Sequence, residues 1–505
     1  MSGKKTKIAF QTLGCKLNFS ETATIGRTFD GGAFQTVDFS ETADIYVINS
    51  CSVTRNAEKR CKALVRQAMK RNPEACVAVV GCFSQINPEE IRAIPGVKLV
   101  LGNADKFNLF EHIRNLTEAQ DLDQGRDQGQ NRGQNMDQGR DQGQNMDQDR
   151  DRNQDRGQNQ NRGQNQDRDR NQIQDQDRDQ NQNQNQGSPA EIQDPTGFVP
   201  SWSEEGRTRS FFKIQDGCDY FCSYCTIPLA RGRSRSNTIA ATLQVASEIA
   251  KSDIRELVLS GVNIGDFGKS HNESLAGLLR ELVGIGKLQR IRISSVEPDL
   301  LHDELIELVA SGPKLMPHFH IPLQSGSDQV LKAMGRRYDT RLFAQRVEKI
   351  RSLMPRACIA ADLIVGFPGE TDALFEETYR FVKETDISYV HVFTYSEREN
   401  TRALKMPGQV PVPQRQERSR IMHGLSDEKK KTFYLHNMHT TGRVLWEKEH
   451  ANGFMYGFTE NYIRVKTPFD PALANQLREV YLNILGDDMV YMNGDLHQSG
   501  RKNKA

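Results

Sequence analysis

A long segment of very low complexity divides this chain and limits what it can fold into. Between about residues 120 and 187 the sequence uses almost only Gln, Asn, Asp, Arg and Gly, and the string QGRDQGQN occurs twice, at 124–131 and 138–145. With so few apolar side chains, burial cannot offset the entropy of ordering the backbone, and a solenoid repeat would need an apolar face for stacking. We predict a disordered linker over 119–195 between two folded parts.

Composition narrows the class of protein. The chain has 505 residues, enough for two or three domains, and its net charge of +1 excludes a globally basic nucleic-acid binder but permits a local basic patch. No early segment resembles a signal peptide and no apolar run could span a bilayer, so we expect a cytoplasmic protein without a membrane partner. In that reducing compartment, nine cysteines favour metal ligation or catalysis over disulfides.

The first folded part, residues 5–118, alternates short apolar runs with helical stretches. This order predicts an open parallel sheet with helices on its faces. Helix is expected at 53–71, and strands are expected at 7–14, 43–50, 76–81 and 97–102.

Three cysteines of this part, Cys15, Cys51 and Cys82, each follow a predicted strand. The carboxyl ends of parallel strands share one edge, so these residues can converge although they are 36 and 31 residues apart. A metal site is the favoured interpretation, and three buried small residues are the alternative. Cys61 and Cys76 lack this placement and are expected to be structural.

The second folded part, residues 204–432, alternates in the same way. Six βα units predict a partial (β/α)6 barrel with its active site at the carboxyl ends of the strands. The strands are expected at 209–217, 256–263, 291–297, 318–325, 358–366 and 389–396.

At the end of the first of these strands lies GCDYFCSYCT (217–226), with Cys218, Cys222 and Cys225. Structural zinc usually takes four protein ligands as two separated pairs, and no second pair follows. An iron–sulfur cube held by three thiolates leaves one iron open to a ligand that is not protein. The CxxxCxxC spacing therefore favours an iron–sulfur cluster.

At this point the sequence resembles the radical S-adenosylmethionine enzymes, which carry CxxxCxxC after the first barrel strand. More narrowly, it resembles the methylthiotransferases over almost all of the chain outside the linker and the tail. The motifs that carry this resemblance are LGCKLN (13–18), INSCSVT (48–54), VVGCFSQ (79–85), GCDYFCSYCTIPLARGRSRS (217–236), LSGVNIGDFG (259–268), PLQSGSDQVLKAMGR (322–336) and LIVGFPGET (363–371).

The resemblance implies two [4Fe-4S] clusters and S-adenosylmethionine as cofactors. Cys218, Cys222 and Cys225 would hold the cluster that generates a 5′-deoxyadenosyl radical, and Cys15, Cys51 and Cys82 an auxiliary cluster that carries the sulfur to be transferred. One S-adenosylmethionine would supply the methyl group and a second the radical. Abstraction of an unactivated aromatic hydrogen needs such cofactor chemistry, because no side-chain base can perform it.

The same resemblance also implies a substrate. LGCKLN, CSYCTIPLARGRSRS and RIRISSVEP (290–298) are most similar to the subfamily that methylthiolates C2 of N6-threonylcarbamoyladenosine at position 37 of tRNA. The alternatives are isopentenyladenosine in tRNA and an aspartate of ribosomal protein S12. Implied partners are the tRNA anticodon stem-loop and an electron donor such as flavodoxin or ferredoxin, but not DNA. A two-cluster electron carrier and a zinc-stabilised RNA-binding protein are rivals from other classes.

Polar residues at the expected barrel mouth are candidate cofactor ligands. A plain turn, ordinary polar loops and a solvated helix end are the competing interpretations of these positions. The candidates are Gly261, Asn263, Ser294, Glu297, Gln324, Ser325 and Arg337.

The last folded part, residues 433–490, is expected to be a small β-barrel, with strands at 444–449, 461–467 and 479–485. It resembles the TRAM domain, which binds RNA. Residues 491–505 are expected to form a disordered tail. The aromatic and basic candidates for RNA contact are Phe454, Tyr456, Tyr462, Arg464 and Lys466.

Overall fold

The computed structural model describes residues 5–116, 195–203, 208–486 and 492–496. The predicted linker lies almost entirely outside these residues, so its prediction stays open. Within the described part of the chain, no helix combines the length and the apolar character needed to cross a membrane.

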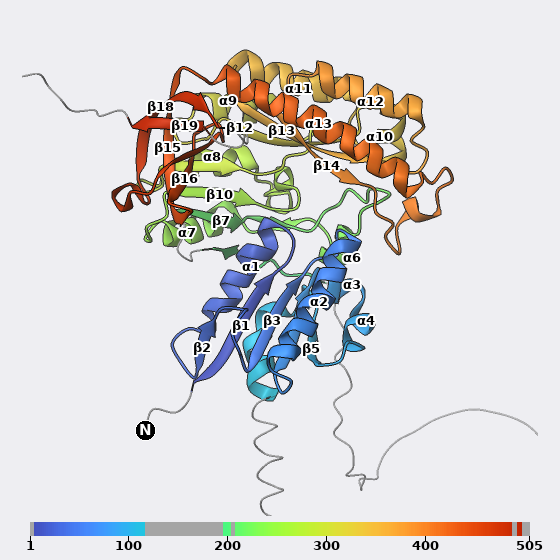
Figure 1. The fold of residues 1–505 in the computed structure, drawn as a ribbon, viewed down its shortest axis with the longest axis vertical. Coiled ribbons are helices and arrows are strands. Elements are labelled where there is room, and N and C mark those ends of the chain that lie inside the picture. The colour runs from blue at the N-terminus through green and yellow to red at the C-terminus, as the bar shows by residue number, and fades with distance from the viewer. Residues whose placement is uncertain (1–4, 117–194, 204–207, 487–491, 497–505) are drawn as a thin grey trace, which may run out of the picture. The chain divides into compact units, whose positions relative to one another are not determined.

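The N-terminal elements, drawn in blue in Figure 1, form a five-stranded parallel sheet in the order β2-β1-β3-β4-β5. Its strands are β1 (Thr6–Thr12), β2 (Phe34–Val37), β3 (Ile45–Ser50), β4 (Cys76–Gly81) and β5 (Val97–Leu101). The connecting helices are α1 (Lys16–Arg27), α2 (Arg55–Arg71), α3 (Cys82–Ile86), α4 (Pro88–Arg92) and the 3-10 turn η1 (Lys106–Asn108). The predicted open parallel sheet is confirmed, with β2 as an additional edge strand.

The central elements contain the six predicted barrel strands as two parallel sets. One set has the order β11-β10-β7, with the short β6 (Ser201–Trp202) added antiparallel to β7, and the other has the order β12-β13-β14. Isolated parallel bridges, such as Ser295 to His320, join β11 to the chain around β12. The strands are β7 (Arg209–Lys213), β10 (Glu256–Ser260), β11 (Arg290–Ile293), β12 (His318–Gln324), β13 (Cys358–Val365) and β14 (Tyr389–Thr394).

Helices follow these strands, as expected for βα units. They are α6 (Ile227–Arg231), α7 (Ile239–Ile249), α8 (Leu275–Leu282), α9 (Asp303–Ser311), α10 (Asp328–Met334), α11 (Thr340–Leu353), α12 (Asp372–Glu384) and α13 (Val412–His436). A two-stranded ribbon of β8 (Gln215–Asp216) and β9 (Arg235–Ser236) flanks the loop that carries Cys218, Cys222 and Cys225. The 3-10 turns are η2 (Ile264–Asp266), η3 (Lys269–His271) and η4 (Arg402–Lys405).

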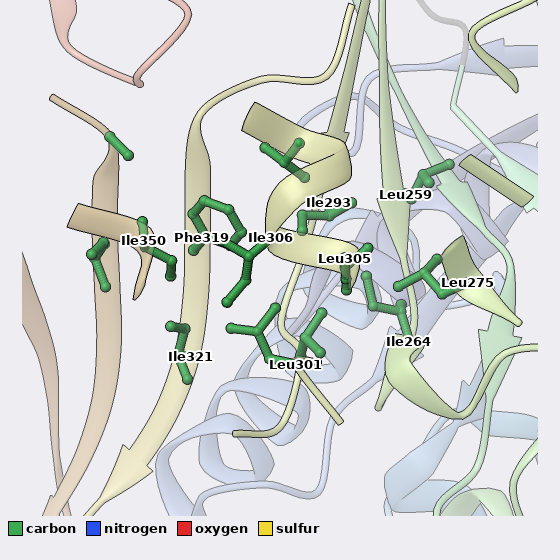
Figure 2. Packing of buried hydrophobic residues seen from close by; sticks show 14 of the residues in the cluster. Leu259, Ile264, Leu275, Ile293, Leu301, Leu305, Ile306, Phe319, Ile321 and Ile350 are labelled. Carbon is green, nitrogen blue, oxygen red and sulfur yellow. The ribbon is translucent and has the colours of Figure 1, made fainter. Parts of the chain in front are cut away.

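A large apolar core fills the space between most of these strands and helices. Figure 2 shows part of it, with Leu259 and Ile293 from neighbouring strands facing Leu275 and Ile306 from helices. Strands buried on both faces read as continuous apolar runs, which is why β10 and β13 were predictable from the sequence. The core fixes the barrel strands, and with them the loops at their carboxyl ends.

The C-terminal strands close into a barrel in the order β15-β16-β17-β19-β18. They are β15 (Thr440–Ala451), β16 (Phe454–Phe458), β17 (Arg464–Pro468), β18 (Leu477–Leu485) and β19 (Met492–Leu496), with the 3-10 turn η5 (Pro471–Leu473). The predicted small barrel is confirmed as a fold. Because β19 pairs with β18, the barrel reaches into the segment that the sequence predicts to be a tail.

Candidate functional site

A glycine with positive φ precedes three of the candidate cysteines. Gly14 and Gly81 both have φ +97°, and Gly217 has φ +70°. L-residues adopt this conformation only with strain, so glycine lets the chain turn sharply where a strand ends. In each case the next residue is a cysteine, which is thereby placed just beyond the carboxyl end of the strand.

Cys15, Cys51 and Cys82 lie at the carboxyl ends of β1, β3 and β4, as predicted. Cys15 is the N-cap residue of α1 and Cys82 is the first residue of α3. A Cβ atom on Gly14 would lie 2.8 Å from Sγ of Cys51, so the first two loops meet closely. The sheet edge thus brings together residues that are distant in sequence.

The environment of the Cys15 and Cys51 thiols opposes their ionisation without a metal. Burial raises the pKa of Cys51 to about 12, and the neighbouring Cys82 and Cys15 add to the effect. Burial also raises the pKa of Cys15, although this residue keeps accessible surface and lines a cavity of about 680 Å³. Both observations fit a thiol on the wall of an open hollow, and ligation of a metal there would displace its proton.

The second cysteine loop is held by backbone hydrogen bonds from three directions. The Cys218 amide donates to the Gly232 carbonyl (3.1 Å), and the Ser223 amide donates to the Met334 carbonyl (2.8 Å). The Ser223 carbonyl in turn accepts from the Ala403 amide (2.8 Å). These contacts fix the loop against the elements that follow β12 and β14.

Each sulfur of the CxxxCxxC loop accepts one N–H hydrogen bond. The donors are the Tyr220 amide to Cys218 (3.4 Å), Arg336 to Cys222 (3.1 Å) and the Ile227 amide to Cys225 (3.4 Å). Such bonds to thiolate sulfurs orient metal ligands and tune iron–sulfur clusters.

A single metal ion and an iron–sulfur cube require different arrangements of their ligands. Among the described residues, no three or more His, Cys, Asp or Glu side chains form a group that could hold a metal ion as they stand. Thiolates around an iron–sulfur cube bind different irons, so they are spaced more widely than the ligands of one ion. Three cysteines at each of two loop clusters match that chemistry, and the ligand roles remain predictions.

A pocket of about 260 Å³ connects the two cysteine regions. Its lining includes Val53 and Thr54, just after Cys51, and Cys225 of the second loop. Its remaining wall comes from the rest of the cysteine loop and the start of α6, from the carboxyl-terminal parts of β12, β13 and β14, and from the loop after β14. These lining residues are Tyr224, Thr226, Ile227, Gln324, Asp362, Ile364, Phe393, Thr394, Tyr395, Ser396 and Arg398. The wall is largely apolar, and the pocket lies where the barrel was expected to have its active site.

Two predicted cofactor ligands lie in the turn after β10. A Cβ on Gly261 would lie 2.7 Å from Ile264 and 2.8 Å from Gln215, so packing within the turn itself requires this glycine. The Asn263 amide donates to Oε1 of Gln215 (2.8 Å), while Oδ1 of Asn263 is buried without a hydrogen-bond partner among the described residues. Oγ of Ser294 is buried in the same condition. Oδ1 of Asn263 can accept a hydrogen bond from a ligand, and the Ser294 hydroxyl can accept or donate one.

The other candidates divide between the mouth and the core. Glu297 forms an ion pair with Arg336, and burial raises the pKa of this carboxyl. Gln324, with φ +66°, lines the pocket described above. Ser325 is fully buried against Thr378 (3.2 Å), away from solvent.

Arg337, the last candidate, packs its guanidinium over the Tyr220 ring at 4.0 Å and donates to the Asp219 carbonyl (2.8 Å). It thereby braces the cysteine loop from outside. The neighbouring Arg336, and not Arg337, reaches a cysteine sulfur. The sequence alone could not show which of the two arginines does so.

A hydrogen-bonded row of side chains crosses the barrel near the pocket. Oδ1 of Asp362 accepts a hydrogen bond from Nε2 of His320 (2.9 Å), and Nδ1 of His320 lies 3.0 Å from Oγ of Ser295. Asp362, which is not among the candidates predicted from the sequence, also lines the pocket. The available signal was its place near the carboxyl end of β13. His318, by contrast, packs against Tyr462, and burial lowers its pKa well below the usual value.

Comparisons with known proteins agree with this arrangement. Residues 212–382 match the radical SAM superfamily, and residues 7–102 match uncharacterized protein family UPF0004. The chain is 34% identical to threonylcarbamoyladenosine tRNA methylthiotransferase MtaB of Bacillus subtilis (strain 168), covering 91% of this chain and 89% of the relative. It is 31% identical to the protein of the same name from Aquifex aeolicus (strain VF5), covering 91% and 96%.

A relative with a different name is less similar. It is tRNA-2-methylthio-N(6)-dimethylallyladenosine synthase of Endomicrobium trichonymphae, with 26% identity over 95% of this chain and 99% of the relative. Among solved structures, the radical S-adenosylmethionine methyltransferase TsrM from Kitasatospora setae aligns with a TM-score of 0.49 and 13% identity, over 79% of this chain and 77% of that one.

Proposed function

This chain belongs to the radical S-adenosylmethionine methylthiotransferases, and on that premise we propose that it methylthiolates C2 of N6-threonylcarbamoyladenosine at position 37 of tRNA. The substrate follows the names of the relatives with 34% and 31% identity. One structural observation carries the proposal: a single pocket is lined both by residues next to Cys51 and by Cys225. A transfer that needs sulfur from one site and a radical from another requires such a shared space.

The proposed cofactors are two [4Fe-4S] clusters and S-adenosylmethionine. Cys218, Cys222 and Cys225 would hold the radical-generating cluster, and Cys15, Cys51 and Cys82 would hold the auxiliary cluster. If bound, these groups would supply the sulfur, the methyl group and the 5′-deoxyadenosyl radical that the transfer needs, at the expense of two S-adenosylmethionine molecules.

The protein's own residues bind the substrate and cofactors, hold them in position and exclude water. Tyr224, Ile364 and Phe393 give the pocket apolar walls, which suit a flat purine and keep solvent from a reactive site. Arg336 ties the Cys222 sulfur to Glu297, so the cysteine loop and the third barrel strand hold a common geometry. Asn263 and Ser294 offer buried oxygens for polar groups of a cofactor.

Contacts with the tRNA are proposed for the C-terminal barrel and the adjoining edge of β14. Arg464 packs over the Tyr456 ring at 4.6 Å and Lys466 over the Phe454 ring at 5.4 Å, which pairs cations with stacking surfaces. A second hollow, of about 400 Å³, runs from Tyr462 to Phe393. Because Phe393 also lines the pocket between the cysteine regions, the two spaces are adjacent.

An electron donor such as flavodoxin or ferredoxin and a cytoplasmic location complete the proposal. Modification of isopentenyladenosine in tRNA is the alternative substrate, since a relative with that kind of name is 26% identical.

The test is mass spectrometry of nucleosides after anaerobic reconstitution with iron and sulfide. The enzyme receives S-adenosylmethionine, a reductant, and either tRNA bearing threonylcarbamoyladenosine or matched tRNA bearing isopentenyladenosine. A methylthio group on the first nucleoside alone is expected. A methylthio group on the second alone moves the substrate assignment, and 5′-deoxyadenosine without product from either tRNA points to a substrate outside tRNA.

A further inference from the structure

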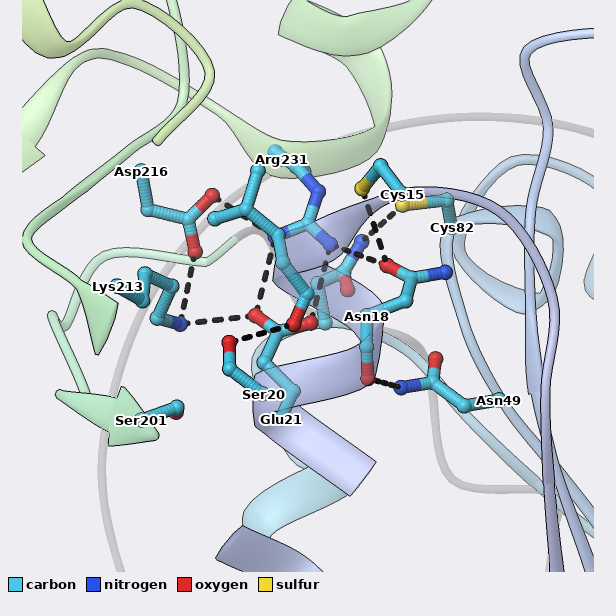
Figure 3. Close-up of polar contacts among 12 residues, drawn as sticks. Cys15, Asn18, Ser20, Glu21, Asn49, Cys82, Ser201, Lys213, Asp216 and Arg231 are labelled. Carbon is cyan, nitrogen blue, oxygen red and sulfur yellow. Dashed lines mark hydrogen bonds and ion pairs between the residues drawn. The ribbon is translucent and has the colours of Figure 1, made fainter. Parts of the chain in front are cut away.

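A network of buried charges lies next to Cys15 and Cys82, and Figure 3 shows most of it. Glu21 of α1 accepts hydrogen bonds from Lys106 (2.6 Å), Lys213 (2.8 Å) and Arg231 (3.0 Å). All four side chains are at most 1% exposed. They come from α1, η1, β7 and α6, so the network joins the N-terminal sheet elements to the start of the barrel.

A second carboxylate completes the network. Asp216 of β8 accepts from Arg231 (2.9 Å) and Lys213 (3.2 Å), and at the network's edge from Arg235 (3.4 Å). Lys213 and Arg231 therefore each pair with both carboxylates, Glu21 and Asp216.

The network does not balance within the described residues. Its buried members are three cations, Lys106, Lys213 and Arg231, against two carboxylates, and Arg235 adds a fourth cation at the edge. The centre of the Phe107 ring lies 5.0 Å from Nζ of Lys213. This cation–π contact stabilises the excess positive charge but does not neutralise it. Uncompensated buried charge is costly, so a negative group belongs beside this network.

Two asparagines indicate where that negative group lies. Arg231 donates to Oδ1 of Asn18 (2.6 Å), the same oxygen that the Cys15 thiol faces at 4.0 Å. Lys106 donates to Oδ1 of Asn103 (2.7 Å), whose amide nitrogen donates to the Cys82 sulfur (3.6 Å). Each asparagine thus links a buried cation to a cysteine of the first set.

We propose that Arg231 and Lys106, acting through Asn18 and Asn103, are positioning residues that supply the countercharge of the anionic iron–sulfur cluster on Cys15, Cys51 and Cys82. This inference rests on the proposed function, which places a cluster there. Three thiolates give such a cluster a net negative charge, and one-electron reduction by an external reductant increases it. Nearby positive charge therefore stabilises the reduced form and raises the reduction potential.

The test isolates the auxiliary cluster and changes the network by one charge at a time. In a background with Cys218, Cys222 and Cys225 all replaced by Ala, the reconstituted protein is titrated with dithionite and the reduced cluster is followed by electron paramagnetic resonance. Arg231→Met removes a cation and should lower the ratio of reduced to oxidised cluster by roughly tenfold or more at a fixed potential. Glu21→Gln removes an anion and should shift the ratio in the opposite direction.

Two further variants separate charge from damage to the fold. The double variant Arg231→Met with Glu21→Gln keeps the charge excess and should return towards the background potential. Arg233→Met, two residues from Arg231 but with a 76% exposed side chain, should leave the potential unchanged because solvent screens its charge.

The outcomes distinguish the two levels of the proposal. Opposite shifts in the single variants, with recovery in the double variant, support the countercharge; loss of iron from folded Arg231→Met but not from the double variant supports it as well. Unchanged or same-direction shifts, or equal iron loss in all network variants, overturn it. Failure of the background protein itself to bind iron contradicts the proposed auxiliary cluster instead.

Discussion

The glycines before the cysteines have a steric role that single substitutions can measure. A methyl group at position 14 would meet Cys51 at 2.8 Å in a backbone region that L-residues avoid. Gly14→Ala should therefore destabilise the fold by about 1–3 kcal/mol and displace the loop of Cys15. We expect loss of iron from the first set of cysteines only, measured by iron content in parallel with 5′-deoxyadenosine formation.

Gly286, which has open space where its Cβ would be, provides the matched control. Gly286→Ala should leave both iron content and stability unchanged. Full iron retention in Gly14→Ala would contradict the steric argument.

Glu256 shows how a buried ion pair makes stability depend on pH. Burial opposes its ionisation, but Arg292, at 2.9 Å, and Arg290 outweigh burial and lower the pKa of Glu256 to about 2. Because the folded-state pKa lies below the unfolded value, the stabilisation is fully present above about pH 4.5 and is lost as pH falls towards about 2. Glu256→Gln should cost about 3–5 kcal/mol in the free energy of unfolding at pH 7, since it leaves buried arginines unpaired.

Urea denaturation at pH 7 and at pH 3 measures this contribution. The difference between wild type and Glu256→Gln should shrink at the lower pH. Glu248→Gln, in an exposed pair with Lys251, should change stability little at either pH. A Glu256→Gln difference that is constant with pH would show that the carboxylate charge is not responsible.

At the scale of elements, strands with long apolar runs were predictable and short or polar ones were not. The runs at β3, β4, β10 and β13 signal strands because both faces are buried. The edge strand β2, FQTV, has too few apolar residues to stand out. In β16, FMYGF, a glycine interrupts the pattern.

The site divides in the same way. The placement of the cysteines was predictable because spacing and strand ends are local signals, and their ligand role stays a prediction. The Glu21 network was not, because Glu21 and Arg231 are 210 residues apart and each looks like an ordinary charged side chain. Only the tertiary fold brings them together.

The edge strand β14 supplies a prediction about RNA binding. Tyr389, His391 and Phe393 alternate along it and line the hollow next to the C-terminal barrel, and Phe393 is 48% exposed. Phe393→Ala should weaken tRNA binding by about 1–3 kcal/mol through the loss of a stacking surface. The dissociation constant, measured by a filter-binding titration, should rise accordingly.

Leu353, also exposed but at the end of α11 and outside the hollow, provides the control. Leu353→Ala should leave tRNA affinity unchanged. Equal affinities for Phe393→Ala and wild type would remove β14 from the proposed path of the RNA.

At the scale of the whole molecule, the low-complexity segment is predicted to be an inert spacer. A flexible chain of about 70 residues spans roughly 45–50 Å, so its length leaves the parts that it connects free to meet. Replacing residues 124–187 with Gly-Ser repeats of equal length should leave the melting temperature and methylthiolation rate unchanged. A salt-sensitive fall in tRNA affinity would instead assign the segment's arginines to RNA binding.

The central claim is a division of labour between two sets of cysteines in one protein. The most direct measurement quantifies 5′-deoxyadenosine and methylthiolated nucleoside side by side in reconstituted Cys218→Ala and Cys51→Ala. We predict that Cys218→Ala forms neither product, whereas Cys51→Ala still forms 5′-deoxyadenosine but no methylthiolated nucleoside. Equal loss of 5′-deoxyadenosine in both variants would contradict the account.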